Sequence, residues 1–152
     1  MIMMRILALD VGTKKIGVAV SDELEIAAHG VTTIRRTELE RDLEALRKII
    51  DEYKPSGILV GVPYNSDGTV SKRGEEILKF AEEIKKTFSI PVELWDESFS
   101  TVSAEKILLE ADLSRGKRKK IIDKMAAVFI LEEYLESKRQ ISQPGIDKHK
   151  KE

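Results

Sequence analysis

The sequence contains no cysteine, so it can form no disulfide and no thiolate metal site. Histidine is nearly absent as well, with only His29 and His149. Any metal site would therefore depend mainly on carboxylates, whose oxygen atoms favour hard ions such as Mg²⁺ or Mn²⁺. No apolar run is long enough to span a membrane, and the first residues lack the pattern of a signal peptide. We expect a cytoplasmic protein without a membrane partner.

The chain also lacks an excess of charge of either sign. Its 26 basic and 27 acidic side chains give a formal net charge of -1, so the molecule as a whole is not a polycation. Binding of nucleic acid would have to rely on local basic clusters, of which residues 115–120 form the densest. A charged cluster is often only solvated surface. Whether these clusters bind nucleic acid depends on whether they surround the functional acids.

The length of 152 residues and the 41% hydrophobic content predict one globular domain. We place this domain at residues 1–138. The remaining residues, 139–152, are polar and include Pro144 and Gly145, and we expect them to form a disordered tail.

The order of the predicted elements indicates a mixed α/β fold. Three strands that can pair antiparallel are followed by helix, strand, helix, strand and two helices. This order predicts a five-stranded sheet with helices on both faces. Thr37 and Glu40 have the spacing of a capping box at the start of the first helix. The expected strands are 4–9, 16–20, 26–34, 57–61 and 91–96, and the expected helices are 39–53, 77–86, about 101–111 and 119–138.

Asp10 stands at the end of the first apolar strand, and Gly12 permits a tight turn after it. An acid in this position is costly unless it is paired, hydrogen-bonded or bound to a metal. The simpler alternative is an aspartate that caps its own turn.

Two further acids can join Asp10. Glu97 also follows a predicted parallel strand, and ligands gather at the carboxyl ends of such strands, so the two acids converge if their strands are neighbours. Asp123 shares a helix face with Ala127 and Ile130, although an acid early in a helix can simply complement the helix dipole. Three clustered carboxylates repel one another, and one or two divalent ions would remove that cost. Such an arrangement suits attack of water on a phosphodiester.

Four segments resemble, in order and spacing, the motifs of the YqgF family, also called RuvX. The fold of this family is similar to ribonuclease H and to the Holliday junction resolvase RuvC, and the match extends to about Leu135. The segments are residues 10–22, Val60–Pro63 with Asn65 and Gly68, Asp96–Glu97 with Ser100, Thr101, Ala104 and Glu105, and Lys120–Ala127.

This resemblance implies a ribonuclease H-like fold and a metal-dependent nuclease. It implies that Asp10, Glu97 and Asp123 are catalytic and hold one or two Mg²⁺ or Mn²⁺ ions. Its implied function is maturation of the 5′ end of precursor 16S ribosomal RNA, in contact with pre-ribosomal particles, with Holliday junction resolution as the alternative. We assign substrate binding to Lys14, Lys15, Asn65, Ser100, Thr101, Arg118 and Lys120; for Asn65 a simple turn is an equal alternative.

The chain departs from related sequences at two positions. Ser98 replaces the arginine that usually follows the Asp-Glu pair, so a phosphate-binding cation must be missing or come from elsewhere, for example from Arg118. Ala126 stands where the resolvase carries a fourth acid. Ala126 therefore counts against strict resolvase chemistry.

Other functions remain open. The turn at Asp10 also looks like the phosphate loop of actin-like and sugar kinases, but these need two such domains and this chain has one. A non-catalytic nucleic-acid-binding module would be expected to lack an acid of the triad. A junction resolvase needs two symmetric cuts and hence a dimer, and the sequence leaves monomer or homodimer open. We expect Trp95 to pack in an interior strand and His29 to be structural rather than catalytic.

Overall fold

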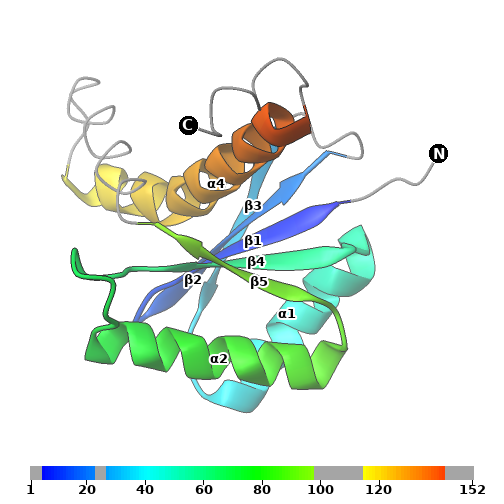
Figure 1. Ribbon diagram of the computed structural model, residues 1–152. Helices are drawn as coiled ribbons and strands as arrows, with labels where there is room; N and C mark the ends of the chain where they lie inside the picture. The colour runs from blue at the N-terminus through cyan, green and yellow to red at the C-terminus, as the bar shows by residue number, and fades with distance from the viewer. Residues whose placement is uncertain (1–4, 23–26, 98–114, 143–152) are drawn as a thin grey trace.

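The computed structural model describes residues 5–22, 27–97 and 115–142, with the backbone alone for 115–124 and 140–142. Five strands form one sheet in the order β3-β2-β1-β4-β5 (Figure 1). The first three strands pair antiparallel, and β4 and β5 continue the sheet in parallel with β1. The mixed five-stranded sheet is therefore confirmed. The strands are β1 (Ile6–Val11), β2 (Lys15–Ser21), β3 (Ala28–Arg35), β4 (Gly57–Val62) and β5 (Val92–Asp96).

Helices cover both faces of this sheet, as expected. α1 (Leu39–Tyr53) and α2 (Lys72–Phe88) lie on one face, and α4 (Arg115–Ser142) crosses the other (Figure 1). None of the helices in the described part is both long and apolar enough to cross a bilayer.

Side chains alternate along each strand between two separate cores, because successive residues of a strand point to opposite faces. In β1, Leu7, Leu9 and Val11 join the core beneath α1 and α2. Ile6 and Ala8 join the core beneath α4. The same alternation directs Asp10 to the α4 face of the sheet.

The turn between β1 and β2 is as tight as the sequence predicts. The backbone N–H of Gly12 donates to the carbonyl oxygen of Lys15 at 2.8 Å. A Cβ atom on Gly12 would lie 2.8 Å from that same oxygen, closer than real side chains come. Only glycine fits this turn, which directly follows Asp10 and Val11.

The start of α1 differs from the expected capping box. Glu38 is the N-cap residue and makes no capping hydrogen bond with its side chain. Instead the carboxylate of Asp42 accepts a hydrogen bond from the backbone N–H of Thr37 at 3.0 Å. The expected capping box of Thr37 and Glu40 was wrong, because Asp42, two residues after Glu40, accepts the backbone N–H of Thr37 instead.

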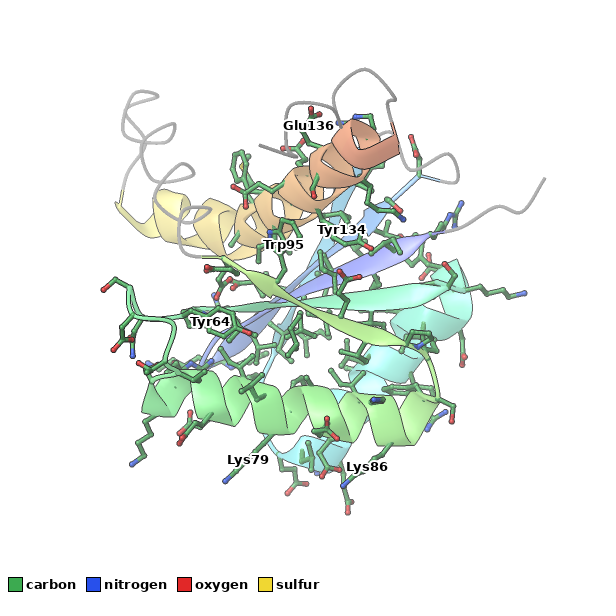
Figure 2. The ribbon with its side chains drawn as sticks, in the orientation of Figure 1. Tyr64, Lys79, Lys86, Trp95, Tyr134 and Glu136 are labelled. Atoms are coloured by element: carbon green, nitrogen blue, oxygen red, sulfur yellow. The ribbon has the colours of Figure 1, made fainter. Side chains whose placement is uncertain are left out.

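Two other expectations also need correction. Trp95 does not lie in an interior strand, since β5 is an edge of the sheet among the described strands. Its ring still packs as expected, edge-on against Tyr134 of α4 with centroids 5.5 Å apart (Figure 2). The last helix extends from Arg115 to Ser142, beyond both ends of the expected range 119–138.

Candidate active site

Asp10 and Glu97 meet on the α4 face, although their strands are not neighbours. β4 lies between β1 and β5. Two strand spacings separate the outer strands by about 10 Å, so a side chain on the middle strand would keep the carboxylates apart. The residue of β4 at this level is Gly61, which pairs with Trp95 of β5. The expectation that Asp10 and Glu97 come from neighbouring strands was therefore wrong. Their two carboxyl groups nevertheless converge, as predicted.

Gly61 leaves the space that the carboxylate of Glu97 occupies. A Cβ atom on Gly61 would lie 2.7 Å from Oε2 of Glu97 and 2.6 Å from Cδ1 of Ile130 in α4. The backbone N–H of Glu97 donates to the carbonyl of Val62 at 3.2 Å, which extends the β4–β5 pairing past Asp96. Glu97 is thus held by its backbone and folds its side chain over Gly61.

The carboxyl groups of Asp10 and Glu97 are in direct contact. Burial, then the charge of Asp10 and a hydrogen bond between the two carboxyls, raises the pKa of Glu97 to about 9. At neutral pH the metal-free pair therefore retains a proton. Oε2 of Glu97 is buried and has no hydrogen-bond partner among the described residues. A buried carboxylate oxygen without a partner, beside a second carboxylate, fits the donor set of a hard divalent cation.

Asp123 lies in α4, one turn before Ala127. Ala126, Ala127 and Ile130 are buried at or below 1% exposure, so the helix approaches the sheet closely through small side chains, as expected. The side chain of Asp123 is outside the described residues. Within the part of the chain whose side chains are described, no group of three potential ligands comes together. The third acid of the expected triad stays a prediction.

Arg73 is a functional candidate that sequence reasoning missed. It lies in the first turn of α2, and its guanidinium donates through Nη2 to the carbonyl oxygen of Val11, the residue after Asp10. Its positive charge opposes the rise in the pKa of Glu97. In the sequence Arg73 looks like one more surface charge beside Lys72, and only the fold brings it to the acids.

A second arginine holds the turn that follows Asp10. Nη1 of Arg36 donates to the carbonyl oxygen of Gly12 at 2.7 Å. Its Nε pairs with the buried carboxylate of Asp42 at 3.4 Å, and its guanidinium lies over the ring of Phe80 in α2. The two consecutive carbonyls after Asp10 are therefore each bound by a guanidinium.

The expected substrate-binding residues are only partly described. Lys14 is exposed at the turn beside Asp10, and Lys15 begins β2. Asn65 donates to the hydroxyl of Thr69 at 2.9 Å and accepts from the N–H of Gly68, which favours the turn alternative. Ser98, Ser100 and Thr101 lie outside the described residues, as do the side chains of Arg118 and Lys120. His29 is exposed on β3, at the opposite edge from β5, in agreement with a non-catalytic residue.

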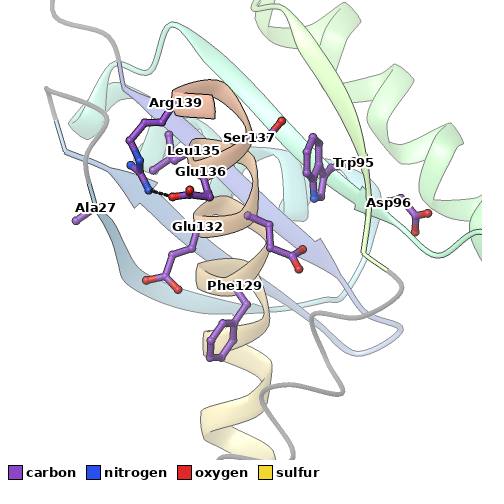
Figure 3. Close-up of a pocket in the computed structure, with 10 residues that line it drawn as sticks. Ala27, Trp95, Asp96, Phe129, Glu132, Leu135, Glu136, Ser137 and Arg139 are labelled. Atoms are coloured by element: carbon purple, nitrogen blue, oxygen red, sulfur yellow. Dashed lines mark hydrogen bonds and ion pairs between the residues drawn. The ribbon is translucent and has the colours of Figure 1, made fainter. Parts of the chain in front are cut away.

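A separate hollow of about 690 Å³ lies between β5 and the second half of α4 (Figure 3). Trp95 and Phe129 supply aromatic surface, and Glu132 and Glu136 line it together with Arg139, which pairs with Glu136 at 2.7 Å. Its acidic lining would repel a nucleic-acid backbone. We do not assign it to the active site.

Comparison with known sequences identifies the family. The family model described as "RuvX: Holliday junction resolvase" matches residues 4–137. Curated relatives named "Putative pre-16S rRNA nuclease" come from Desulforamulus reducens, at 54% identity over 88% of this chain and 98% of the relative, and from Clostridium kluyveri, at 53% identity over 88% and 97%. A third relative of that name, from Thermoanaerobacter pseudethanolicus, is 50% identical over 90% and 99%.

Comparison with solved structures identifies the fold. The structure titled as Thermus thermophilus RuvC in complex with a Holliday junction substrate has a TM-score of 0.53 at 12% identity, covering 84% of this chain and 91% of that one. The fowlpox virus resolvase with its substrate Holliday junction DNA has a TM-score of 0.55 at 14% identity, covering 88% and 98%. The expected ribonuclease H-like fold is confirmed.

Proposed function

Because this chain belongs to the RuvX family, we propose that it is a metal-dependent nuclease whose reaction centre is the contact between Asp10 and Glu97. The observation that carries the proposal is the buried Oε2 of Glu97. It has no hydrogen-bond partner in the described part of the chain and lies beside a second carboxylate at the ends of parallel strands. A buried acid without a partner lowers the stability of the fold. Acids of this kind are typical of functional sites.

We assign Asp10, Glu97 and Asp123 as ligands of one or two Mg²⁺ or Mn²⁺ ions. Bound there, the ions would lower the pKa of an attacking water and stabilise the leaving oxygen. The protein side chains supply the rest of the site. Glu97 presents its carboxylate over Gly61 beside Asp10, and Arg73 and Arg36 donate to the carbonyl oxygens of the two residues after Asp10. Lys14, exposed at the adjoining turn, can hold a substrate phosphate.

The preferred substrate is the precursor of 16S ribosomal RNA, cut during maturation of its 5′ end in the cytoplasm. The names of relatives at about half identity over nearly their whole length support this choice. The description of the family supports four-way DNA as the alternative. That alternative requires a dimer, because resolution of a junction needs two symmetric cuts.

Cleavage by the parent protein and by Asp10→Asn tests the proposal. Each protein is offered precursor 16S RNA with its 5′ leader, and a four-way DNA junction, with Mg²⁺ or Mn²⁺ at the same salt concentration. We expect the parent to cut the RNA and Asp10→Asn to be at least about a hundredfold slower, because it removes a metal ligand. Asp51→Asn, an exposed acid on α1, is the matched control and keeps full activity.

The outcomes separate the alternatives. Paired cuts in the junction alone, by a dimeric protein, would replace the RNA substrate by branched DNA. Equal cutting by the parent and Asp10→Asn would remove Asp10 from the reaction. RNA binding without cutting of either substrate would leave a binding module as the better description.

A further inference from the structure

We infer that Arg73 is the positioning residue of this site: it holds the end of β1 so that Asp10 faces Glu97. This inference rests on the proposed nuclease function and adds a residue to that same site. Arg73 reaches the site from α2, on the opposite face of the sheet from α4, so it approaches the β1 end from the side away from the acids.

The hydrogen bonds of Arg73 indicate positioning rather than substrate contact. Nη2 donates to the carbonyl of Val11, directly after Asp10. Nη1 pairs with Glu76 one turn further along α2 at 3.0 Å. Both ends of the guanidinium are thus engaged by the protein, and the side chain is only 29% exposed. A planar fork bound at two points fixes the β1 backbone relative to α2.

The N-terminus of α2 is itself fixed against the end of β4. Ser71 caps the helix and accepts a hydrogen bond from the N–H of Gly74 at 3.1 Å. A Cβ on Gly74 would lie 2.5 Å from Cγ1 of Val70 and 3.4 Å from the carbonyl oxygen of Pro63, the residue after β4. This close packing places the start of α2 against the end of β4, whose last residue, Val62, accepts the N–H of Glu97. The start of α2 therefore contacts both the end of β1, which carries Asp10, and the end of β4, which binds the backbone of Glu97.

Helix stability does not explain an arginine at this position. The N-terminus of a helix carries partial positive charge, so a cation in the first turn is unfavourable there. The carbonyl oxygen of Val11 and the carboxylate of Glu76 accept hydrogen bonds from its guanidinium instead. The contact with the end of β1, rather than the helix dipole, therefore explains an arginine at this position.

The test compares Arg73→Gln and Arg73→Lys with two further variants. Lys79→Gln removes an equal charge from α2 at a side chain that points away from the sheet (Figure 2). Glu76→Gln breaks the ion pair but leaves the bond to Val11. With saturating metal, we expect Arg73→Gln to lower kcat by about 10- to 100-fold while KM stays within about twofold, because misplacement of a catalytic group has effects of this size. Arg73→Lys recovers part of kcat, and Lys79→Gln stays near the parent. Glu76→Gln, which loses one of the two points that hold the guanidinium, falls between the parent and Arg73→Gln.

Hydrogen exchange provides a readout that does not depend on activity. We expect faster amide exchange in Arg73→Gln over residues 9–15 and unchanged exchange over α4. A rise in KM with constant kcat would make Arg73 a substrate contact and overturn the inference. Unchanged kcat with a lower melting temperature would reduce Arg73 to a purely structural residue and overturn it too. If the parent cuts neither substrate, the proposed function fails. Exchange over residues 9–15 still tests the inference in that case, because unchanged exchange in Arg73→Gln would show that Arg73 does not hold the end of β1.

Discussion

At the scale of single residues, the site depends on an absent side chain as much as on those present. Asp10 and Glu97 come from strands separated by β4, and they meet only because Gly61 has no Cβ between them. The carboxylate of Glu97 then fills that space and lies beneath Ile130 of α4. A small side chain at residue 61 should therefore reduce cleavage activity more than it reduces the stability of the fold.

We expect Gly61→Ala to lower cleavage activity more than tenfold and stability by about 1–3 kcal/mol, the usual range for overpacking. The added methyl would displace Oε2 of Glu97 and Cδ1 of Ile130, both of which lie under 3 Å from its position. Gly57→Ala, in the same strand, is the matched control because its nearest atom would lie 3.4 Å away. Cleavage rates and urea titrations measure both effects. Full activity in Gly61→Ala would show that Glu97 needs no space there.

The convergence of Asp10 and Glu97 could be predicted because each stands at the end of a predicted strand, which is a local pattern. The roles of Gly61 and Arg73 could not be predicted in this way. Gly61 matters because β4 lies between β1 and β5, and strand order depends on the whole sheet. Arg73 matters because α2 starts beside the end of β1, more than sixty positions away in sequence.

At the scale of elements, α1 is tied to the active-site turn by a buried pair. Asp42 is 3% exposed and accepts from the N–H of Thr37 and from Nε of Arg36. Arg36 in turn donates to the carbonyl of Gly12. The start of α1 thus supports the backbone beside Asp10, which the capping-box pattern did not reveal because that pattern concerns only neighbouring residues.

Asp42→Asn should lower the free energy of unfolding by about 1–3 kcal/mol, because it leaves the partly buried guanidinium of Arg36 without its carboxylate. Glu40→Gln is the control: it removes an exposed acid from the same helical turn and should change stability little. Urea titrations of the three proteins measure the difference. Equal midpoints for both variants would mean that the pair contributes nothing.

At the scale of the whole molecule, a net charge of -1 must be reconciled with a polyanionic substrate. General attraction is too weak, so binding has to come from cations gathered at the active edge. Lys14 and Lys15 lie at the turn beside Asp10, whereas Lys79 and Lys86 project from α2 away from the sheet (Figure 2). The two pairs carry equal charge in different places, which allows location to be tested apart from net charge.

The salt dependence of RNA binding should distinguish the two pairs. Each phosphate contact on a single strand contributes about 0.7 to the slope of log Kd against log salt concentration. Replacement of both Lys14 and Lys15 by alanine should therefore reduce the slope by about 1.4 if both lysines contact phosphate. The double replacement of Lys79 and Lys86 should leave it unchanged, although it alters net charge equally. Equal slopes in both double variants would place the RNA on another surface, since charge near Asp10 would then have no special effect.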